Sequence, residues 1–166
     1  MKRSLLALAF AFVLGGWAAP AAAVLIPLTA SLDCAQAETC GVGGTGTGSA
    51  TISFDTDTRL LTWDVVWSGL SSAGFAAHFH GPALPGEDAG IVVDFGGVPV
   101  GTSGGHSGDA TISETGAAEL LAGLWYLNVH SANFLNGEIR GQVLVPEPAA
   151  GALLAASLLG LALRRR

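Results

Sequence analysis

Short runs of alternating apolar and polar residues fill the middle of the chain, where helical periodicity is nearly absent. These runs are rich in Val, Ile, Thr, Phe and Trp, and Gly, Asp, Asn and Pro separate them. Alternation with a period of two is typical of strands with one buried face. The pattern predicts eight strands, at Val24–Ala30, Gly48–Asp55, Arg59–Gly69, Gly74–His80, Ile91–Phe95, Asp109–Ser113, Leu124–His130 and Glu138–Val145.

The segments between these strands contain turn residues and one helical pattern. Asp55–Thr58 and Asn136-Gly137 have the composition of tight hairpin turns. Glu114–Gly123 is the one stretch that favours a helix, and the glycines of Gly41–Gly48 predict a flexible loop. The expected fold class is all-β, a single antiparallel β-sandwich or open Greek-key barrel of about eight strands.

Three of the predicted strands carry polar residues on one face and apolar residues on the other. The polar face holds His78, His80, Tyr126, Asn128, His130, Glu138, Arg140 and Gln142. A hairpin that turns through Asn136-Gly137 would set His130 opposite Glu138 and Asn128 opposite Arg140. That register keeps every apolar residue on the other side, which is the arrangement that burial selects.

The N-terminus has the organisation of a secretory signal peptide. Lys2 and Arg3 precede an apolar run over Leu5–Leu14, and small residues follow over Ala18–Ala23. A membrane anchor is the alternative, but the apolar run is shorter than the roughly 20 residues that a spanning helix needs. We expect residues 1–23 to be removed by signal peptidase.

The C-terminus carries a second sorting pattern. Pro146, Glu147 and Pro148 precede an uncharged apolar stretch over Ala149–Leu163, and Arg164, Arg165 and Arg166 follow it. As a helix this stretch would rise about 22 Å, which is short of a hydrocarbon core of roughly 30 Å, and the arginines would hold its end in the cytoplasm. Residues 146–166 resemble the PEP-CTERM sorting signal of Gram-negative bacteria. The resemblance implies a transient inner-membrane anchor, cleavage by an exosortase, and a cell-surface or secreted product. A plain C-terminal anchor is the alternative.

The charge of the central segment differs from that of the whole chain. The whole chain has a formal net charge of −6, but within residues 24–148 Arg59 and Arg140 are the only Lys or Arg residues, against 13 acidic residues. The segment therefore carries a formal charge of −11. Nucleic-acid binding is excluded, because that affinity depends largely on Lys and Arg that neutralise phosphates. Divalent cations fit this surface better.

Cys34 and Cys40 are the only cysteines, and in an exported protein they predict a disulfide that closes a small loop. A metal site with two cysteines is the alternative, but this spacing matches no common zinc pattern.

The segments Ala77–Ala83, Tyr126–Ser131 and Gly137–Gln142 are similar to three signature stretches of the chordin-type CHRD domain. The resemblance assigns residues 24–145 to that domain. It implies an extracellular β module without an established activity. Exopolysaccharide or a neighbouring surface protein is the partner class that we expect, with Trp63 or Trp67 stacking on sugar if either is exposed.

The histidines admit three interpretations. In the first, His78, His80 and His130 form a structural polar network with Asn128, Glu138 and Arg140, and no cofactor is bound. In the second, the three histidines bind copper or zinc, because a His-x-His pair projects both rings from one face of a strand. That pattern resembles the copper-binding strand of copper–zinc superoxide dismutases, although no His/Asp loop like their zinc subsite occurs. His106 is a further candidate ligand, because the glycine-rich stretch Gly104–Gly108, which we expect to be a loop, could bring it to the other three.

Catalysis is the third interpretation and the least supported. Ser131 follows His130 directly, so the two side chains point to opposite faces of a strand and do not form a nucleophile–base pair. We therefore expect a non-enzymatic binding or structural protein, with metal-dependent redox activity as the alternative.

Overall fold

Alternating burial runs through β1 (Leu25–Asp33), where every second side chain from Ile26 to Leu32 is buried. This strand belongs to a computed structural model that describes residues 24–38 and 43–147 of the chain. Among the described residues the structure has eight strands, one α-helix and one short 3₁₀ helix, so the predicted all-β class is confirmed. The elements after β1 are η1 (Cys34–Gln36), β2 (Thr47–Asp55), β3 (Leu60–Ser68), β4 (Gly74–His80), β5 (Ile91–Asp94), β6 (Gly104–Thr111), α1 (Glu114–Leu121), β7 (Tyr126–Ser131) and β8 (Phe134–Gln142).

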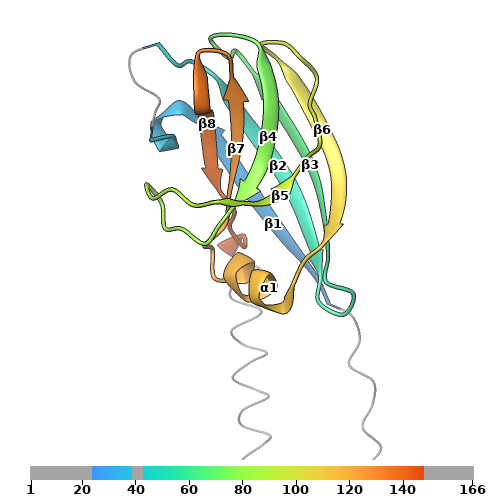
Figure 1. Cartoon of the computed structure of the whole chain (residues 1–166). Coiled ribbons are helices and arrows are strands. Elements are labelled where there is room, and N and C mark those ends of the chain that lie inside the picture. The colour runs from blue at the N-terminus through green and yellow to red at the C-terminus, as the bar shows by residue number, and fades with distance from the viewer. Residues whose placement is uncertain (1–23, 39–42, 148–166) are drawn as a thin grey trace, which may run out of the picture.

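All eight strands form one antiparallel sheet in the order β5-β4-β7-β8-β1-β2-β3-β6. Strands β1, β2 and β3 follow one another as neighbours, whereas β4 lies across the sheet beside β7. Figure 1 shows the sheet curling into a nearly closed barrel, with α1 at one end. The inward faces form one apolar core that includes Leu28, Ile52, Phe79, Leu127 and Ile139.

The two edge strands of the sheet, β5 and β6, face each other without pairing, and aromatic side chains lie between them. The Phe95 ring, just after β5, stacks on Trp63 of β3 at 4.8 Å between ring centroids. It also stacks on His106 of β6 at 4.9 Å. A bridge between Gly74 and Gly101 joins the same two sides of the barrel. The gap in hydrogen bonding is therefore filled by side chains.

The glycine-rich stretch Gly104–Gly108 is part of strand β6, not the predicted loop. An added Cβ at Gly104 would lie 2.8 Å from the Trp67 ring, and one at Gly108 would lie 2.6 Å from the Trp63 ring. Glycine at these positions lets both indoles pack flat against the backbone of the strand. Trp63 and Trp67 are buried, so neither is the exposed sugar-stacking residue that the sequence allowed for.

The last hairpin turns earlier than the sequence predicts. Ser131 pairs with Phe134, so the turn consists of Ala132 and Asn133 rather than Asn136-Gly137. Gly137 lies inside β8 with a φ of 113°, a conformation that favours glycine. Gly137, which the sequence placed in a turn, therefore lies at an irregularity of β8. At this point the pairing of β8 with β7 shifts register, between Val129 and Ser131 of β7.

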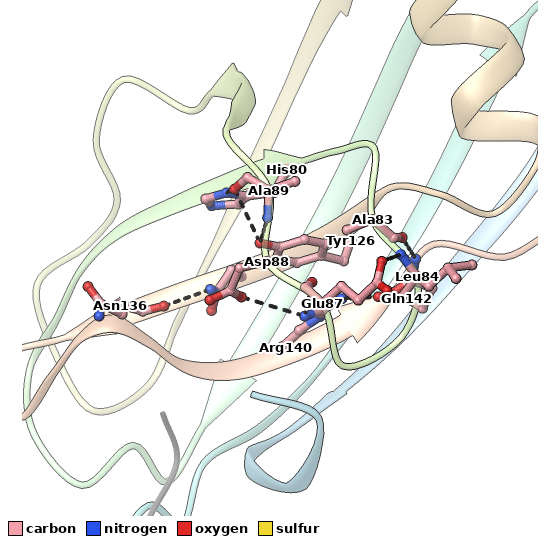
Figure 2. Close-up of polar contacts among 11 residues, drawn as sticks. His80, Ala83, Leu84, Glu87, Asp88, Ala89, Tyr126, Asn136, Arg140 and Gln142 are labelled. Carbon is pink, nitrogen blue, oxygen red and sulfur yellow. Dashed lines mark hydrogen bonds and ion pairs between the residues drawn. The ribbon is translucent and has the colours of Figure 1, made fainter. Parts of the chain in front are cut away.

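Strand β7 is buried on both faces: all six of its residues are buried. One face points into the barrel core. On the other face, the segment Ala83–Ala89, here called the strap, contacts Tyr126 of β7 and Arg140 and Gln142 of β8 (Figure 2). These three polar side chains therefore lie between the sheet and the strap. This arrangement positions the candidate site.

Several predicted features lie outside the described residues. They are the signal peptide (residues 1–23), Cys40, Pro148, the apolar stretch Ala149–Leu163, and Arg164 to Arg166. Within the two described ranges, no helix combines the length and the apolar character needed to cross a membrane.

Candidate functional site

Three histidines meet on the outer face of β4 and β7. His78 and His80 project from β4, and His130 projects from β7, which pairs with β4. One ring nitrogen from each histidine lies within 4.8 Å of the other two. The closest pair is His78 Nδ1 and His130 Nε2, at 3.0 Å. The structure thus brings together the three residues that the sequence proposed as ligands.

The other nitrogen of each ring faces an oxygen atom. His130 Nδ1 lies 2.8 Å from the Leu135 carbonyl oxygen, and His80 Nδ1 lies 3.0 Å from the Ala89 carbonyl oxygen. A carbonyl only accepts hydrogen bonds, so both Nδ1 atoms carry the proton and both Nε2 atoms keep a lone pair. His78 Nε2 lies 3.6 Å from Asp94 Oδ1. In metal sites, the ring nitrogen that does not bind the metal usually makes a contact of this kind, which orients the histidine.

Burial favours the neutral form of the three rings. His80 is 8% exposed and His130 is 7% exposed. Loss of hydration lowers the pKa of His78, His80 and His130 below the ordinary value of 6.5, and this effect outweighs the opposing contacts with Asp94, Ala89 and Leu135. Neutral imidazole is the form that binds metals. His80 Nε2 is buried and has no hydrogen-bond partner among the described residues.

A pocket of about 200 Å³ opens over His80 and His130. Its wall includes Asp88 from the strap and Asn128 from β7. Glu38 lies beside Asp88, and the hydrogen bond and negative charge of Asp88 raise the pKa of the Glu38 carboxyl. Asp88 and Glu38 thus form an acidic rim, whose negative charge attracts cations. The pocket leaves room above the rings for a further ligand or a water molecule.

The separations fit a metal ion after small side-chain adjustments. An ion about 2.0–2.1 Å from each nitrogen requires nitrogens no more than about 4.2 Å apart. Tetrahedral coordination would bring the nitrogens to about 3.4 Å from one another. The 3.0 Å pair lies near that value, and nitrogens separated by up to 4.8 Å would have to move closer together. Three imidazoles with one open position are typical of zinc and copper sites.

The structure places the predicted network partners differently from one another. Asn128 lies opposite Arg140 in the register, as the sequence predicts, and its amide donates to the Asn136 carbonyl oxygen. Glu138 is fully buried, but its carboxylate accepts from the backbone N–H groups of Ser71 and Thr45 instead of from His130. The register shift around Gly137 explains this difference, because it breaks the alternation on which the expected pairing rests.

Arg140 and His106 make their hydrogen bonds outside the three-histidine group. The Arg140 guanidinium packs on Tyr126 and binds the strap. His106 Nδ1 accepts a hydrogen bond from Trp63 Nε1 at 3.2 Å. His106 therefore belongs to the aromatic cluster at the barrel edge, and it is not part of the three-histidine group.

Sequence reasoning missed the oxygen atoms that orient the rings. Two of them are main-chain carbonyls, of Ala89 and Leu135, and no residue type marks a carbonyl as an acceptor. Asp94 ends β5, one strand away from His78, and only the pairing of β5 with β4 brings it close.

Cys34 begins η1, and Cys40 lies outside the described residues, so the disulfide stays a prediction.

The CHRD domain family matches residues 28–143. This match covers well over half of the chain, so the chain belongs to the CHRD domain family. Neither a curated protein nor a solved structure matches the chain.

Proposed function

We propose that this protein is an exported CHRD module whose outer face binds one transition-metal ion through His78, His80 and His130. One observation carries the proposal: three ring nitrogens converge while the other nitrogen of each ring faces an oxygen. Imidazole nitrogen suits copper and zinc, and affinities of nitrogen sites generally favour Cu(II) over Zn(II). We therefore expect Cu(II) to bind more tightly than Zn(II).

The burial of both candidate tryptophans removes the residues that would support polysaccharide binding. The acidic rim and the buried, unpartnered Nε2 of His80 favour a small cation instead. A surface protein remains a partner that the metal site does not require.

Pulsed electron paramagnetic resonance of the protein with equimolar Cu(II) tests the proposal. We expect the modulation pattern of three coordinated imidazoles, which falls to two in the His130→Ala variant. A spectrum of hydrated or scattered copper with no imidazole signal would overturn the proposal.

The second candidate function is metal-dependent redox activity of the superoxide dismutase type. The pocket favours this activity, because its space would leave a coordination position for a small molecule. A superoxide decay assay with the copper-loaded protein measures it directly. Loss of superoxide no faster than with His80→Ala would leave binding as the only function. We propose the binding role as the primary one.

We also propose export and surface sorting. Residues 1–23 would be removed by signal peptidase, and an exosortase would cleave near Pro146-Glu147-Pro148 after a transient inner-membrane stage in a Gram-negative cell. The order of basic, apolar and small residues at one end, and of motif, apolar stretch and arginines at the other, supports this route. Intact mass of the exported protein should show a start near Val24 and an end near Pro148. Surface protein that retains Arg166 would contradict it.

A further inference from the structure

The strap Ala83–Ala89 is held against the barrel by side chains of the outer face. Arg140 is 2% exposed, and its two terminal nitrogens donate to the carbonyl oxygens of Glu87 at 2.7 Å and of Leu84 at 3.0 Å. Figure 2 shows these contacts beside His80. A buried guanidinium that binds two carbonyls of one segment fixes both the position and the orientation of that segment.

Gln142 extends the same attachment. Its amide nitrogen donates to the Ala83 carbonyl oxygen at 2.9 Å and to the Gly123 carbonyl oxygen at 2.7 Å. Its amide oxygen accepts from Arg140 Nη2 at 3.2 Å. The first part of the strap is therefore tied to β8 and to the loop before β7 at once.

Tyr126 links this attachment to the histidine site. The Arg140 guanidinium carbon lies 3.6 Å from the centroid of the Tyr126 ring. The His80 ring stacks on Tyr126 at 4.9 Å with an interplanar angle of 8°, and Figure 2 shows the tyrosine between Arg140 and His80. The Tyr126 hydroxyl accepts from the Ala89 N–H at 3.1 Å. It thus holds the residue whose carbonyl oxygen faces His80 Nδ1.

We propose that Tyr126 and Arg140 are positioning residues for His80, an inference that rests on the proposed metal-binding function. They hold the Ala89 carbonyl oxygen where it keeps the proton on His80 Nδ1, so that the Nε2 lone pair points into the three-histidine group. Loss of this second layer of contacts should lower metal affinity about 10- to 100-fold, the range that is typical for partners of metal-bound histidines.

The proposed positioning role and a purely structural role, in which Tyr126 and Arg140 only anchor the strap, predict different effects of mutation. An anchor affects stability alone, whereas a positioning residue changes the tautomer of one ring. Tyr126→Phe removes only the hydroxyl and keeps the ring that stacks on His80. Arg140→Met is the second variant. Arg59→Met is a control for the loss of one arginine, because Arg59 is exposed and donates to the Ile112 carbonyl oxygen instead of to the strap.

The experiment combines ¹⁵N nuclear magnetic resonance of the metal-free protein with Cu(II) binding. In the wild type we expect His80 to carry its proton on Nδ1, and in Tyr126→Phe we expect a mixture of tautomers and a Kd for Cu(II) raised about tenfold or more. Copper-bound Tyr126→Phe should give the two-imidazole pattern of His80→Ala in part of the population. Arg140→Met should show the same trend, and Arg59→Met should not.

An unchanged His80 tautomer and an unchanged Kd in Tyr126→Phe would overturn the positioning role, even if the variant melts at a lower temperature. Failure of the wild type to bind Cu(II) would instead overturn the proposed function. The tautomer measurement in the absence of metal separates the two failures.

Discussion

His78 Nδ1 lies 3.0 Å from His130 Nε2, and in the metal-free protein a proton must lie between them. The Leu135 carbonyl oxygen keeps the His130 proton on Nδ1, so His130 Nε2 accepts from His78 Nδ1. His78 Nε2 then presents a lone pair toward the carboxylate of Asp94 at 3.6 Å. In the proposed metal-bound form, a cation would take the place of the shared proton, and His78 Nε2 would then carry a proton toward Asp94.

The lowered pKa values predict acid sensitivity of the metal-free protein. Because the pKa of His130 is lower in the folded protein than in the unfolded chain, the unfolded chain binds more protons between those two values. The same holds for His78 and His80. The contribution of these histidines to the free energy of unfolding should therefore be constant above about pH 7 and should fall as the pH drops below about 6.5.

Urea unfolding at several pH values measures this dependence. His130→Gln should show a weaker decrease with falling pH, because one of the three groups no longer titrates. An equal slope in that variant would show that His130 does not contribute to the acid sensitivity.

A variant of Glu138 tests whether this buried carboxylate stabilises the fold or takes part in the metal site. Glu138→Ala removes the acceptor for the N–H groups of Ser71 and Thr45 and should lower the free energy of unfolding by about 1–3 kcal/mol. The Kd for Cu(II) should stay unchanged, because this carboxylate contacts two loops instead of the histidines. Denaturation and metal titration of the same variant check both parts. A weakened Kd would place Glu138 in the site after all.

The glycines of β6 test the packing of the barrel edge. In Gly108→Ala the new Cβ would lie 2.6 Å from the Trp63 ring, so we expect a loss of about 1–3 kcal/mol from overpacking. Gly90→Ala is the matched control, because a Cβ there meets nothing within 4 Å. Thermal melts of both variants make the comparison. Equal melting temperatures would mean that Trp63 does not pack against this strand.

The predicted Cys34–Cys40 disulfide should contribute modestly to stability. Closing so short a loop stabilises by at most about 2–3 kcal/mol in the chain-entropy model. Reduction should therefore lower the melting temperature without unfolding the domain. Labelling of both thiols in denatured protein that has not been reduced would show that no disulfide forms.

Local pattern predicted the strands well, because alternation in β1, β2 and β3 reflects burial directly. The loop predicted at Gly104–Gly108 was wrong, because glycine there makes room for the indoles of two tryptophans of β3. Local pattern failed again at Asn136-Gly137, where a turn-like pair lies within β8. The pairing of β4 with β7 and the course of the strap are long-range features, so the histidines were predictable and their oxygen partners were not.

Titration of the purified protein with Cu(II) by calorimetry, for the wild type, His80→Ala and His106→Gln, tests the metal site most directly. His106 is the matched control, because it lies in the aromatic cluster and glutamine keeps an acceptor for Trp63 Nε1. We predict one Cu(II) per chain in the wild type and in His106→Gln, and a Kd for Cu(II) that is raised about tenfold or more in His80→Ala, where only two imidazoles remain. Equal binding by all three proteins, or none by the wild type, would contradict a metal site built from His78, His80 and His130.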